Sequence, residues 1–411
     1  MTDVYALIEE QYTNSARLQQ LSYGTPEGAA ARASTEPQQM YADRLARCPI
    51  EHHGDSLYTA YTMADLLFLN KHRDVEQGSR FLGSTRPAIP LGLDGEQHRK
   101  YRRLLDPVFA PKRIAPLEAK IRQLANEMID QFVDDGEVDA YHVWCEPLPS
   151  TIFLSVMGLP MSDRDNFISF KNRILGTADP SLSADEVMAQ RMEAVGWIQN
   201  YFMQELDLRE REAAPRDDMI GWLLTTEVDG ERLTREDVLD ILGLLMIAGL
   251  DTVAASLACF LSYFARHADQ RARIVNDRAL LPSAIEELMR FESPVTEGMR
   301  RVLVDITLPS GTVLPAGSWV LISWSAANLD PAAFANPLDV DLERSPNAHI
   351  GFASGFHRCL GSHLARMEMR AALDVWHDRI PNYQIAPDVE LSYSGNPRAP
   401  HQLPLVWPPR I

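Results

Sequence analysis

Cys359 has the most distinctive chemical surroundings of the four cysteines in this chain. It follows a glycine-rich stretch, residues 351–358, and precedes a helical pattern, so it lies where a loop turns into a helix. Unpaired backbone N–H groups and the helix dipole stabilise a thiolate at such a position. The glycines permit close approach of the backbone, and the flat ring of Phe352 can pack against a planar ligand. Cys359 is therefore a candidate metal ligand.

Three interpretations of this cysteine compete. A lone cysteine is most often a buried small hydrophobe. A zinc site would use His349, His357, Cys359 and His363, but their spacing differs from that of the paired ligands in structural zinc modules. A haem-iron thiolate needs only one cysteine, held in a donor-rich turn beneath a flat macrocycle. The segment by itself leaves all three open.

Asp251 and Thr252 place an acid and a hydroxyl in an almost wholly apolar helical pattern, directly after the apolar stretch 241–250. A long apolar pattern of this kind is normally a buried central helix. A threonine hydroxyl that bonds back along the helix would be a purely structural explanation.

Two charged patterns also place side chains on shared helix faces. Glu287 and Arg290 are three residues apart, and an isolated exposed pair of this kind is worth well under about 1 kcal/mol. His98 and Arg102 are four residues apart in a helix that begins after Asp94. They point the same way and are suited to gripping one anionic group.

Helical periodicity dominates the elements that must position these residues. Apolar residues recur at steps of three and four in the segments 118–134, 186–212, 236–268, 282–291 and 360–379. Strand-like pieces are short and late, at 302–308, 318–323 and 403–407, with Pro and Gly between them. The chain shows no GxGxxG or P-loop, so we do not expect it to bind a dinucleotide itself. We predict a mainly α fold with a small β-rich portion, formed by one domain over residues 1–411.

The composition is that of a globular protein, with 45% hydrophobic and 23% charged residues among 411. A formal net charge of −18 disfavours non-specific binding to nucleic acid. The apolar stretch 241–250 is shorter than the roughly 20 residues of a membrane span, and the first residues do not read as a signal peptide. The cysteines contain no CxxC pair, which fits a reducing compartment. We expect a cytoplasmic protein without a membrane span or nucleic-acid partner.

The sequence around Cys359 resembles the cysteine loop of the cytochrome P-450 family, the haem-thiolate monooxygenases. The family pattern FGxGxHxCxG is matched at Phe352, Gly355, His357, Cys359 and Gly361, with Ala353 in place of the first glycine. Other family patterns recur in the right order from about residue 60 to 406. The resemblance implies the family's fold, in which haem b lies between the long central helix and the helix that follows the cysteine loop.

The resemblance also implies roles for the residues of the loop and the central helix. Cys359 would be the proximal iron ligand, and His357 would contact a haem propionate. The family's AGxDT motif is matched at Ala248, Gly249, Asp251 and Thr252. The carboxylate and the hydroxyl would guide protons into an otherwise dry pocket, and Ala248 would share the haem-facing side.

Further positions match family motifs away from the loop. Glu287, Arg290 and Arg344 would form a buried network that performs no chemistry, while His98 and Arg102 would bind propionates, although Gly95 and Glu96 stand where the family has prolines. Arg301, or alternatively Arg300, resembles a further propionate arginine, with a spacing from Arg301 to Asp305 that is one residue short. His349, Asn328 and the pair Asp330-Pro331 fit the family's approach to the loop and are expected to be structural.

The implied reaction inserts one oxygen atom from O2 into a hydrophobic small molecule. Electrons would come from NAD(P)H through a ferredoxin reductase and a [2Fe-2S]-type ferredoxin. The candidate docking residues for the ferredoxin are Arg99, Arg103, Lys112, Arg113 and Arg358. The candidate substrate-pocket residues are Ile89, Leu91, Leu244, Val295 and Met299. Two alternatives keep the haem: a ligand-binding or sensing protein without turnover, and a peroxide-driven peroxygenase, against which the presence of both Asp251 and Thr252 argues.

Overall fold

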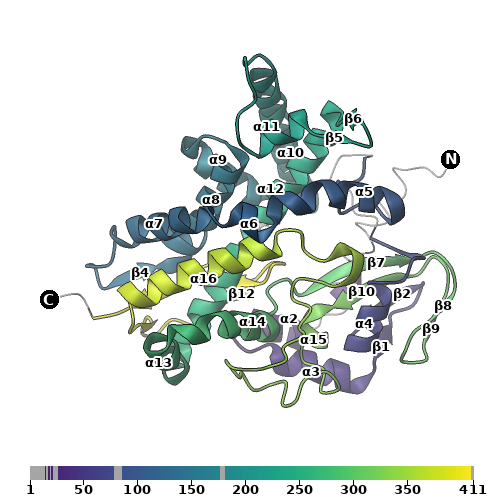
Figure 1. Ribbon diagram of the computed structural model, residues 1–411. Coiled ribbons are helices and arrows are strands. Elements are labelled where there is room, and N and C mark those ends of the chain that lie inside the picture. The colour runs from purple at the N-terminus through teal and green to yellow at the C-terminus, as the bar shows by residue number, and fades with distance from the viewer. Residues whose placement is uncertain are drawn as a thin grey trace.

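The computed structural model describes residues 14, 17, 18, 20, 21, 26–77, 86–175 and 181–408. Helices form the larger body of the molecule, and the main sheet lies to one side, at the lower right of Figure 1. This arrangement confirms the prediction of a mainly α fold with a small β portion.

The α-helices cover most of the described chain, and the predicted helical segments coincide with α7, α10, α12, α14 and α16. The helices are α2 (Pro26–Ala33), α3 (Gln38–Arg47), α4 (Met63–Leu69), α5 (Gly95–Leu105), α6 (Pro111–Ile114), α7 (Leu117–Ile129), α8 (Pro147–Met157), α9 (Arg164–Leu175), α10 (Ala184–Glu210), α11 (Met219–Thr225), α12 (Arg235–Arg266), α13 (Ala268–Asn276), α14 (Leu281–Glu292), α15 (Trp324–Ala327) and α16 (Ser362–Arg379). Short 3-10 turns are η1 (Asp106–Phe109), η3 (Met161–Asp163), η4 (Arg278–Leu280) and η5 (Gly355–His357), and η2 (Tyr141–Cys145) is one turn of π-helix.

The strands are short. They are β1 (Ile50–His52), β2 (Leu57–Ala60), β3 (Val75–Glu76), β4 (Glu137–Asp139), β5 (Glu227–Val228), β6 (Glu231–Arg232), β7 (Glu297–Val302), β8 (Ile306–Thr307), β9 (Val313–Leu314), β10 (Trp319–Ser323), β11 (Gln384–Ile385), β12 (Tyr393–Ser394), β13 (Ala399–Pro400) and β14 (Pro404–Val406). The main sheet has the order β1-β2-β10-β7-β3, in which β2 and β10 run parallel and the other neighbours antiparallel.

The strand predicted at 302–308 was wrong in its position, whereas those at 318–323 and 403–407 are confirmed by β10 and β14. The chain instead forms β7 at Glu297–Val302, and only Ile306–Thr307 of the predicted segment is a separate strand. Two adjacent arginines interrupt the apolar–polar alternation that would have marked β7 in the sequence. Arg300 is buried, and Arg301 pairs with Glu76 on the neighbouring strand β3. Pairing with β10 and β3 defines this strand.

The central helix α12 carries the apolar pattern and is the core of the body. Thr234 caps its start by accepting a hydrogen bond from the Asp237 backbone, and acidic residues occupy its first turn, as the helix dipole favours. Its length and composition would suffice to cross a membrane, but 72% of its most apolar 18-residue window is buried inside the protein. The largest core cluster joins α12 to α7, α8, α14 and α16.

Candidate active site

The loop that carries Cys359 is fixed against the segment after α4. Gly355 has φ +67°, and a Cβ there would lie 2.1 Å from the Asn70 carbonyl oxygen, so glycine is required on both counts. The Cys359 backbone N–H donates to the Phe352 carbonyl at 2.9 Å, which closes the loop just before α16. Arg102 from α5 donates to the Arg358 carbonyl at 2.7 Å and ties α5 to the same loop.

The Cys359 side chain is solvent-accessible although it lies deep among protein atoms. Burial raises the pKa of its thiol, while a hydrogen bond from the Gly361 backbone and the charges of Arg102, Arg366 and Arg358 act in the opposite direction. The solvent accessibility of the Cys359 sulfur and the raised pKa of its thiol are consistent with each other if the sulfur faces an internal space rather than bulk water. A thiol in this setting becomes a thiolate when it coordinates a metal cation, whose charge outweighs the cost of burial.

Along α12, Ala248 interrupts the buried pattern. It is exposed in the middle of a helix whose next turns are almost completely buried. Gly249 follows, and a Cβ there would lie 2.4 Å from the Phe153 ring, so the glycine lets α12 and α8 pack closely. The Thr252 hydroxyl donates to the Ala248 carbonyl at 3.0 Å, which is the back-bonding that the sequence allowed as a structural explanation. Ala248 and Thr252 therefore share one side of α12, as predicted.

Asp251 points toward α9, where Lys171 meets it. The Lys171 Nζ atom lies 3.0 Å from Asp251 Oδ1 and 2.6 Å from Glu146 Oε1, and all three side chains are buried. Sequence reasoning missed Lys171 and Glu146. Lys171 does stand on the apolar face of its helix, one residue after Phe170 and four after Phe167, and a lysine at such a position was the available signal.

His98 and His357 lie together between α5 and the cysteine loop, with ring centroids 4.3 Å apart. Burial, followed by the charges of His357 and Arg102, lowers the pKa of His98 to about 4, so this ring is neutral at pH 7. The His357 Nε2 atom is 2.9 Å from Asp94 Oδ1, while its Nδ1 atom is buried without a hydrogen-bond partner among the described residues. Asp94 thus serves the histidine instead of capping α5, which begins at Gly95 with φ +59°.

Arg300, rather than Arg301, belongs to this cluster, which corrects the assignment preferred from the sequence. Arg300 is 3% exposed and donates to Asn70 Oδ1 at 2.7 Å and to Gln77. Burial lowers the pKa of Arg300 to about 10, and Asp94 offsets only part of that shift.

Arg301 projects from the opposite face of β7. It lies 3.6 Å from Glu76 Oε1 and stacks over the Trp319 ring, whose centroid is 5.6 Å from Cζ. The period-2 alternation of strand side chains forces two adjacent arginines to opposite faces, so only one of them can reach the histidines.

The structure brings Glu287, Arg290 and Arg344 together in one network. The Glu287 carboxylate accepts from Arg290 Nη2 at 2.7 Å and from Arg344 Nε at 3.0 Å, and the first two side chains are completely buried. Arg290 also donates to the backbone carbonyls of Asn328 and Pro337. This network ties α14 to the chain that leads to the cysteine loop.

The zinc interpretation finds no support in the described part of the chain, where no three His, Cys, Asp or Glu side chains form a group able to hold a metal ion. His349 is 2.9 Å from Glu286 Oε2. Asn328 accepts from the Ile350 backbone at 2.8 Å, and Asp330 accepts from the Met63 backbone at 2.9 Å. These contacts match the structural roles expected for the three residues.

The predicted substrate-pocket residues divide into two groups. Leu91, Leu244 and Val295 are partly exposed and lie outside the buried core clusters. Ile89 is buried in the main core cluster. The structure does not place Met299 with the other predicted pocket residues. It packs in a separate core cluster on the Arg301 face of β7, away from the Arg300 face.

A basic surface surrounds the cysteine loop. Arg103, Lys112 and Arg358 are exposed, and no ion pair is recorded for them within the described ranges. Two other predicted docking residues have acidic neighbours: Arg99 pairs with Glu96, and Arg113 pairs with Asp217 at 3.1 Å.

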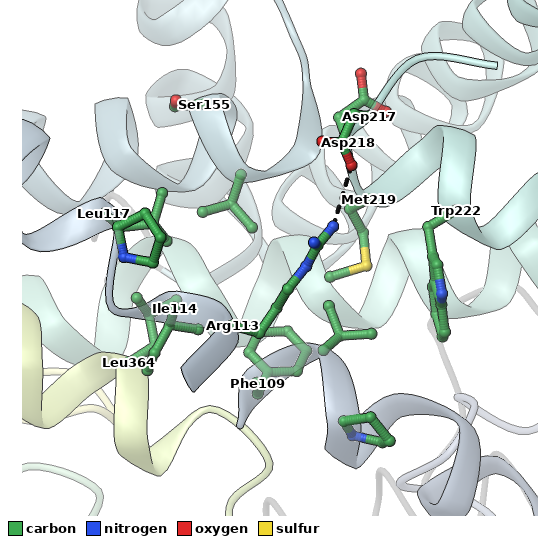
Figure 2. Close-up of a pocket in the computed structure, with 14 residues that line it drawn as sticks. Phe109, Arg113, Ile114, Leu117, Ser155, Asp217, Asp218, Met219, Trp222 and Leu364 are labelled. Atoms are coloured by element: carbon green, nitrogen blue, oxygen red, sulfur yellow. Dashed lines mark hydrogen bonds and ion pairs between the residues drawn. The ribbon is translucent and has the colours of Figure 1, made fainter. Parts of the chain in front are cut away.

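Beside this surface is a cleft of about 580 Å³ between η1, α6, α8, α11 and the start of α16. Figure 2 shows Arg113 crossing the cleft to Asp217, with the Phe109, Met219 and Trp222 side chains around it. Its lining includes none of the residues predicted to contact iron or propionates.

The residues around Cys359 fit a haem group. A planar ligand with two carboxylates and a central metal needs a sulfur donor, an open face and unpaired donors. Cys359 supplies the sulfur donor. The open face is supplied by the exposed Ala248 and by Gly361, where an added Cβ would meet no atom within 4 Å. The incompletely balanced cation of Arg300 and His357 Nδ1, which has no hydrogen-bond partner in the described part of the chain, supply the unpaired donors.

Comparisons with known proteins agree with this site. The sequence model described as cytochrome P-450 matches residues 47–375. The chain is 32% identical to a mycinamicin IV hydroxylase/epoxidase of Micromonospora griseorubida, over 79% of this chain and 82% of that protein. It is also 32% identical to a methyl-branched lipid omega-hydroxylase of Mycobacterium tuberculosis, over 77% and 74%. Among solved structures, CYP109E1 of Bacillus megaterium in complex with testosterone superposes with a TM-score of 0.82 at 25% identity, covering 90% of this chain and 97% of that one.

Proposed function

Since this chain belongs to the cytochrome P-450 family, whose members similar to it are hydroxylases, epoxidases and monooxygenases, we propose a role for each residue of its site. The protein is a haem-dependent monooxygenase that acts on a hydrophobic small molecule. Haem, when bound, supplies the oxygen-inserting chemistry. Cys359 holds the iron through its sulfur, and this thiol at the start of α16 is the observation that carries the proposal.

The polar residues divide the remaining tasks. Arg300, His98 and the Nδ1 atom of His357 bind the propionates, and Arg102 joins them from α5 beside the loop. The stack of Arg366 on Phe352, 4.2 Å from ring centroid to Cζ, fixes the aromatic ring, which would pack against the flat haem group. Thr252 and Asp251 supply protons from α12, and the Glu287 network keeps the loop in place.

The substrate contacts come from the partly exposed apolar residues Leu91, Leu244 and Val295, together with Ala248. A panel of lipophilic compounds titrated into the purified holoprotein tests both the haem and the substrate class. A compound that displaces water from the iron shifts the Soret band. A protein without haem absorption, or a reduced carbon monoxide complex with the spectrum of a histidine-ligated globin, would disprove the assignment of Cys359.

Electrons enter from a [2Fe-2S]-type ferredoxin that docks on the basic surface around the cysteine loop and is itself reduced by an NAD(P)H-dependent reductase. Arg103, Lys112 and Arg358 support this because they are exposed cations, without an ion pair among the described residues, on a protein with a net charge of −18. We also propose that residues 1–411 act as one domain, in the cytoplasm. One core cluster, with members from Ile89 to Trp407, supports the single domain.

Charge reversal tests the docking surface. Arg103→Glu combined with Lys112→Glu should slow ferredoxin-driven turnover strongly and leave peroxide-driven turnover nearly unchanged, because only the former needs the partner. Arg47→Glu on α3, an exposed arginine outside that surface, is the matched control. Equal slowing of both reactions would remove the docking proposal.

A further inference from the structure

The buried ion cluster at Asp251 continues beyond the central helix. Lys171 bridges Asp251 and Glu146, and their side chains are 2%, 6% and 6% exposed. A charge so deeply buried is costly even when paired, and hydrophobic replacements of such clusters are often neutral or stabilising. The cluster is therefore poorly explained by stability alone, and its position next to Thr252 suggests a part in the reaction.

Glu146 connects this cluster to the surface. Its second carboxylate oxygen, Oε2, lies 3.9 Å from Nδ1 of His142, whose side chain is 53% exposed. The three contacts from Asp251 through Lys171 and Glu146 to His142 thus link a buried carboxylate to solvent by ionisable side chains. Histidine is the side chain that ordinarily changes its charge near neutral pH, which suits the outermost member of such a series.

The local backbone brings these groups together. Tyr141 to Cys145 form a single turn of π-helix directly before α8, and Glu146 follows it. Such turns are rare and occur frequently at functional sites. Here the turn directs His142 outward while Tyr141 and Glu146 face Lys171, with the Tyr141 hydroxyl 3.5 Å from the Lys171 Nζ atom.

The other titratable groups around the cluster do not compete as proton carriers near pH 7. Burial raises the pKa of Tyr141 and of Cys145 and Cys259 beside it. His401 is 3.0 Å from the Tyr141 hydroxyl, and burial lowers the pKa of His401. Among the described residues, Asp139 is a further titratable neighbour, 4.0 Å from His142 at the surface end.

We propose that His142, Glu146 and Lys171 form the route by which protons from solvent reach the Asp251 carboxylate. The proposal rests on the function assigned above to Asp251 and Thr252. The Lys171 ammonium gives one proton to Asp251 and regains one from the carboxyl of Glu146. The Glu146 carboxylate is protonated by the His142 imidazolium, which recovers its proton from water. One proton enters per cycle, and every group on the route returns to its starting charge.

The first test measures proton movement without catalysis. The chain has five lysines, of which Lys171 is the buried one, and the other four are exposed or partly exposed. In protein labelled with ¹⁵N-lysine and held in the diamagnetic reduced carbon monoxide complex, NMR reports exchange of the Lys171 ammonium protons with water. Glu146→Gln keeps the shape but cannot carry the proton, so exchange should slow by about 100-fold, which is the lower end of what a positioned proton donor contributes.

The second test uses turnover. Glu146→Gln and His142→Gln should lower product formed per NAD(P)H consumed and raise the solvent deuterium isotope effect in ferredoxin-driven turnover. Peroxide brings its own protons, so peroxide-driven turnover should change by less than about twofold. His52→Gln, at an exposed histidine on β1, is the matched control. These variants avoid Lys171→Met, which would leave two buried carboxylates uncompensated and could unfold the protein.

The outcomes separate the possibilities. Slower exchange at Lys171 together with poorer coupling supports the route. Exchange and coupling within twofold of the His52→Gln control would overturn it, and so would an equal loss of peroxide-driven turnover, which indicates a structural role. If the parent protein forms no product with any electron supply, the proposed function fails, whereas the exchange measurement still decides the route.

Discussion

Replacing Arg300 by methionine should have opposite effects on the protein without haem and on haem retention. At pH 7 this buried guanidinium is charged, although burial lowers its pKa from 12.5 to about 10. A shift of this size corresponds to about 3 kcal/mol of unfavourable free energy, as an upper limit. Loss of the hydrogen bonds to Asn70 and Gln77 offsets part of the gain. The free energy of unfolding of the haem-free Arg300→Met variant should therefore equal or exceed that of the parent.

Haem retention should decrease in the Arg300→Met variant, because the Arg300 guanidinium binds a propionate. A hydrogen bond to a charged group contributes about 1.5–3 kcal/mol, so its loss should speed haem release by about 10- to 100-fold. The assay is transfer of haem to excess apomyoglobin, followed in the Soret band. Urea unfolding of the haem-free variants and of the haem-free parent measures their free energies of unfolding.

Arg301→Met is the matched control on the same strand. Arg301 lies 3.6 Å from Glu76 and is partly exposed, so its removal should change haem release by less than about twofold. The reasoning would be refuted if Arg301→Met released haem faster than Arg300→Met. It would also be refuted if Arg300→Met unfolded the haem-free protein easily while haem release stayed at the parent rate.

Three further predictions concern the loop and the network that holds it. Glu287→Ala should lower the free energy of unfolding, measured in urea, by about 3–5 kcal/mol, because the buried Arg290 and the partly buried Arg344 lose their counter-charge; a loss under 1 kcal/mol would contradict this. Burial raises the pKa of Glu286, but hydrogen bonds from Arg366 and His349 outweigh it and lower the pKa to about 2. Ionised Glu286 therefore contributes up to about 3 kcal/mol to the free energy of unfolding above pH 4.5, and this contribution is lost as the pH falls through 2. Glu286→Gln should remove that part of the acid dependence. An unchanged profile of the free energy of unfolding against pH would refute the assignment. Gly355→Ala should reduce the haem-loaded fraction in the Soret band, because its Cβ would collide with the backbone after α4, and normal loading would show that the loop can shift.

The local features of this protein could be predicted because they depend on residues near one another in the chain. The helical start after Cys359, the shared face of Glu287 and Arg290 and the apolar pattern of α12 are all properties of spacing within a few turns. Physical reasoning from these patterns gave candidate residues, and the family motifs gave their order. The helices at all five predicted segments follow from the same local periodicity.

Long-range pairing decided the rest. Whether Arg300 or Arg301 faces the histidines depends on the register of β7 against β10, since a slip of one residue would exchange their faces. The same register sends Met299 into a separate core cluster. Lys171 meets Glu146 and Asp251, which are 25 and 80 residues away, only because α9 packs against α8 and α12. The sequence alone therefore determined which side chains could do chemistry, and the tertiary structure decided which of them meet, because contacts between distant segments depend on how whole elements pack and pair rather than on local spacing.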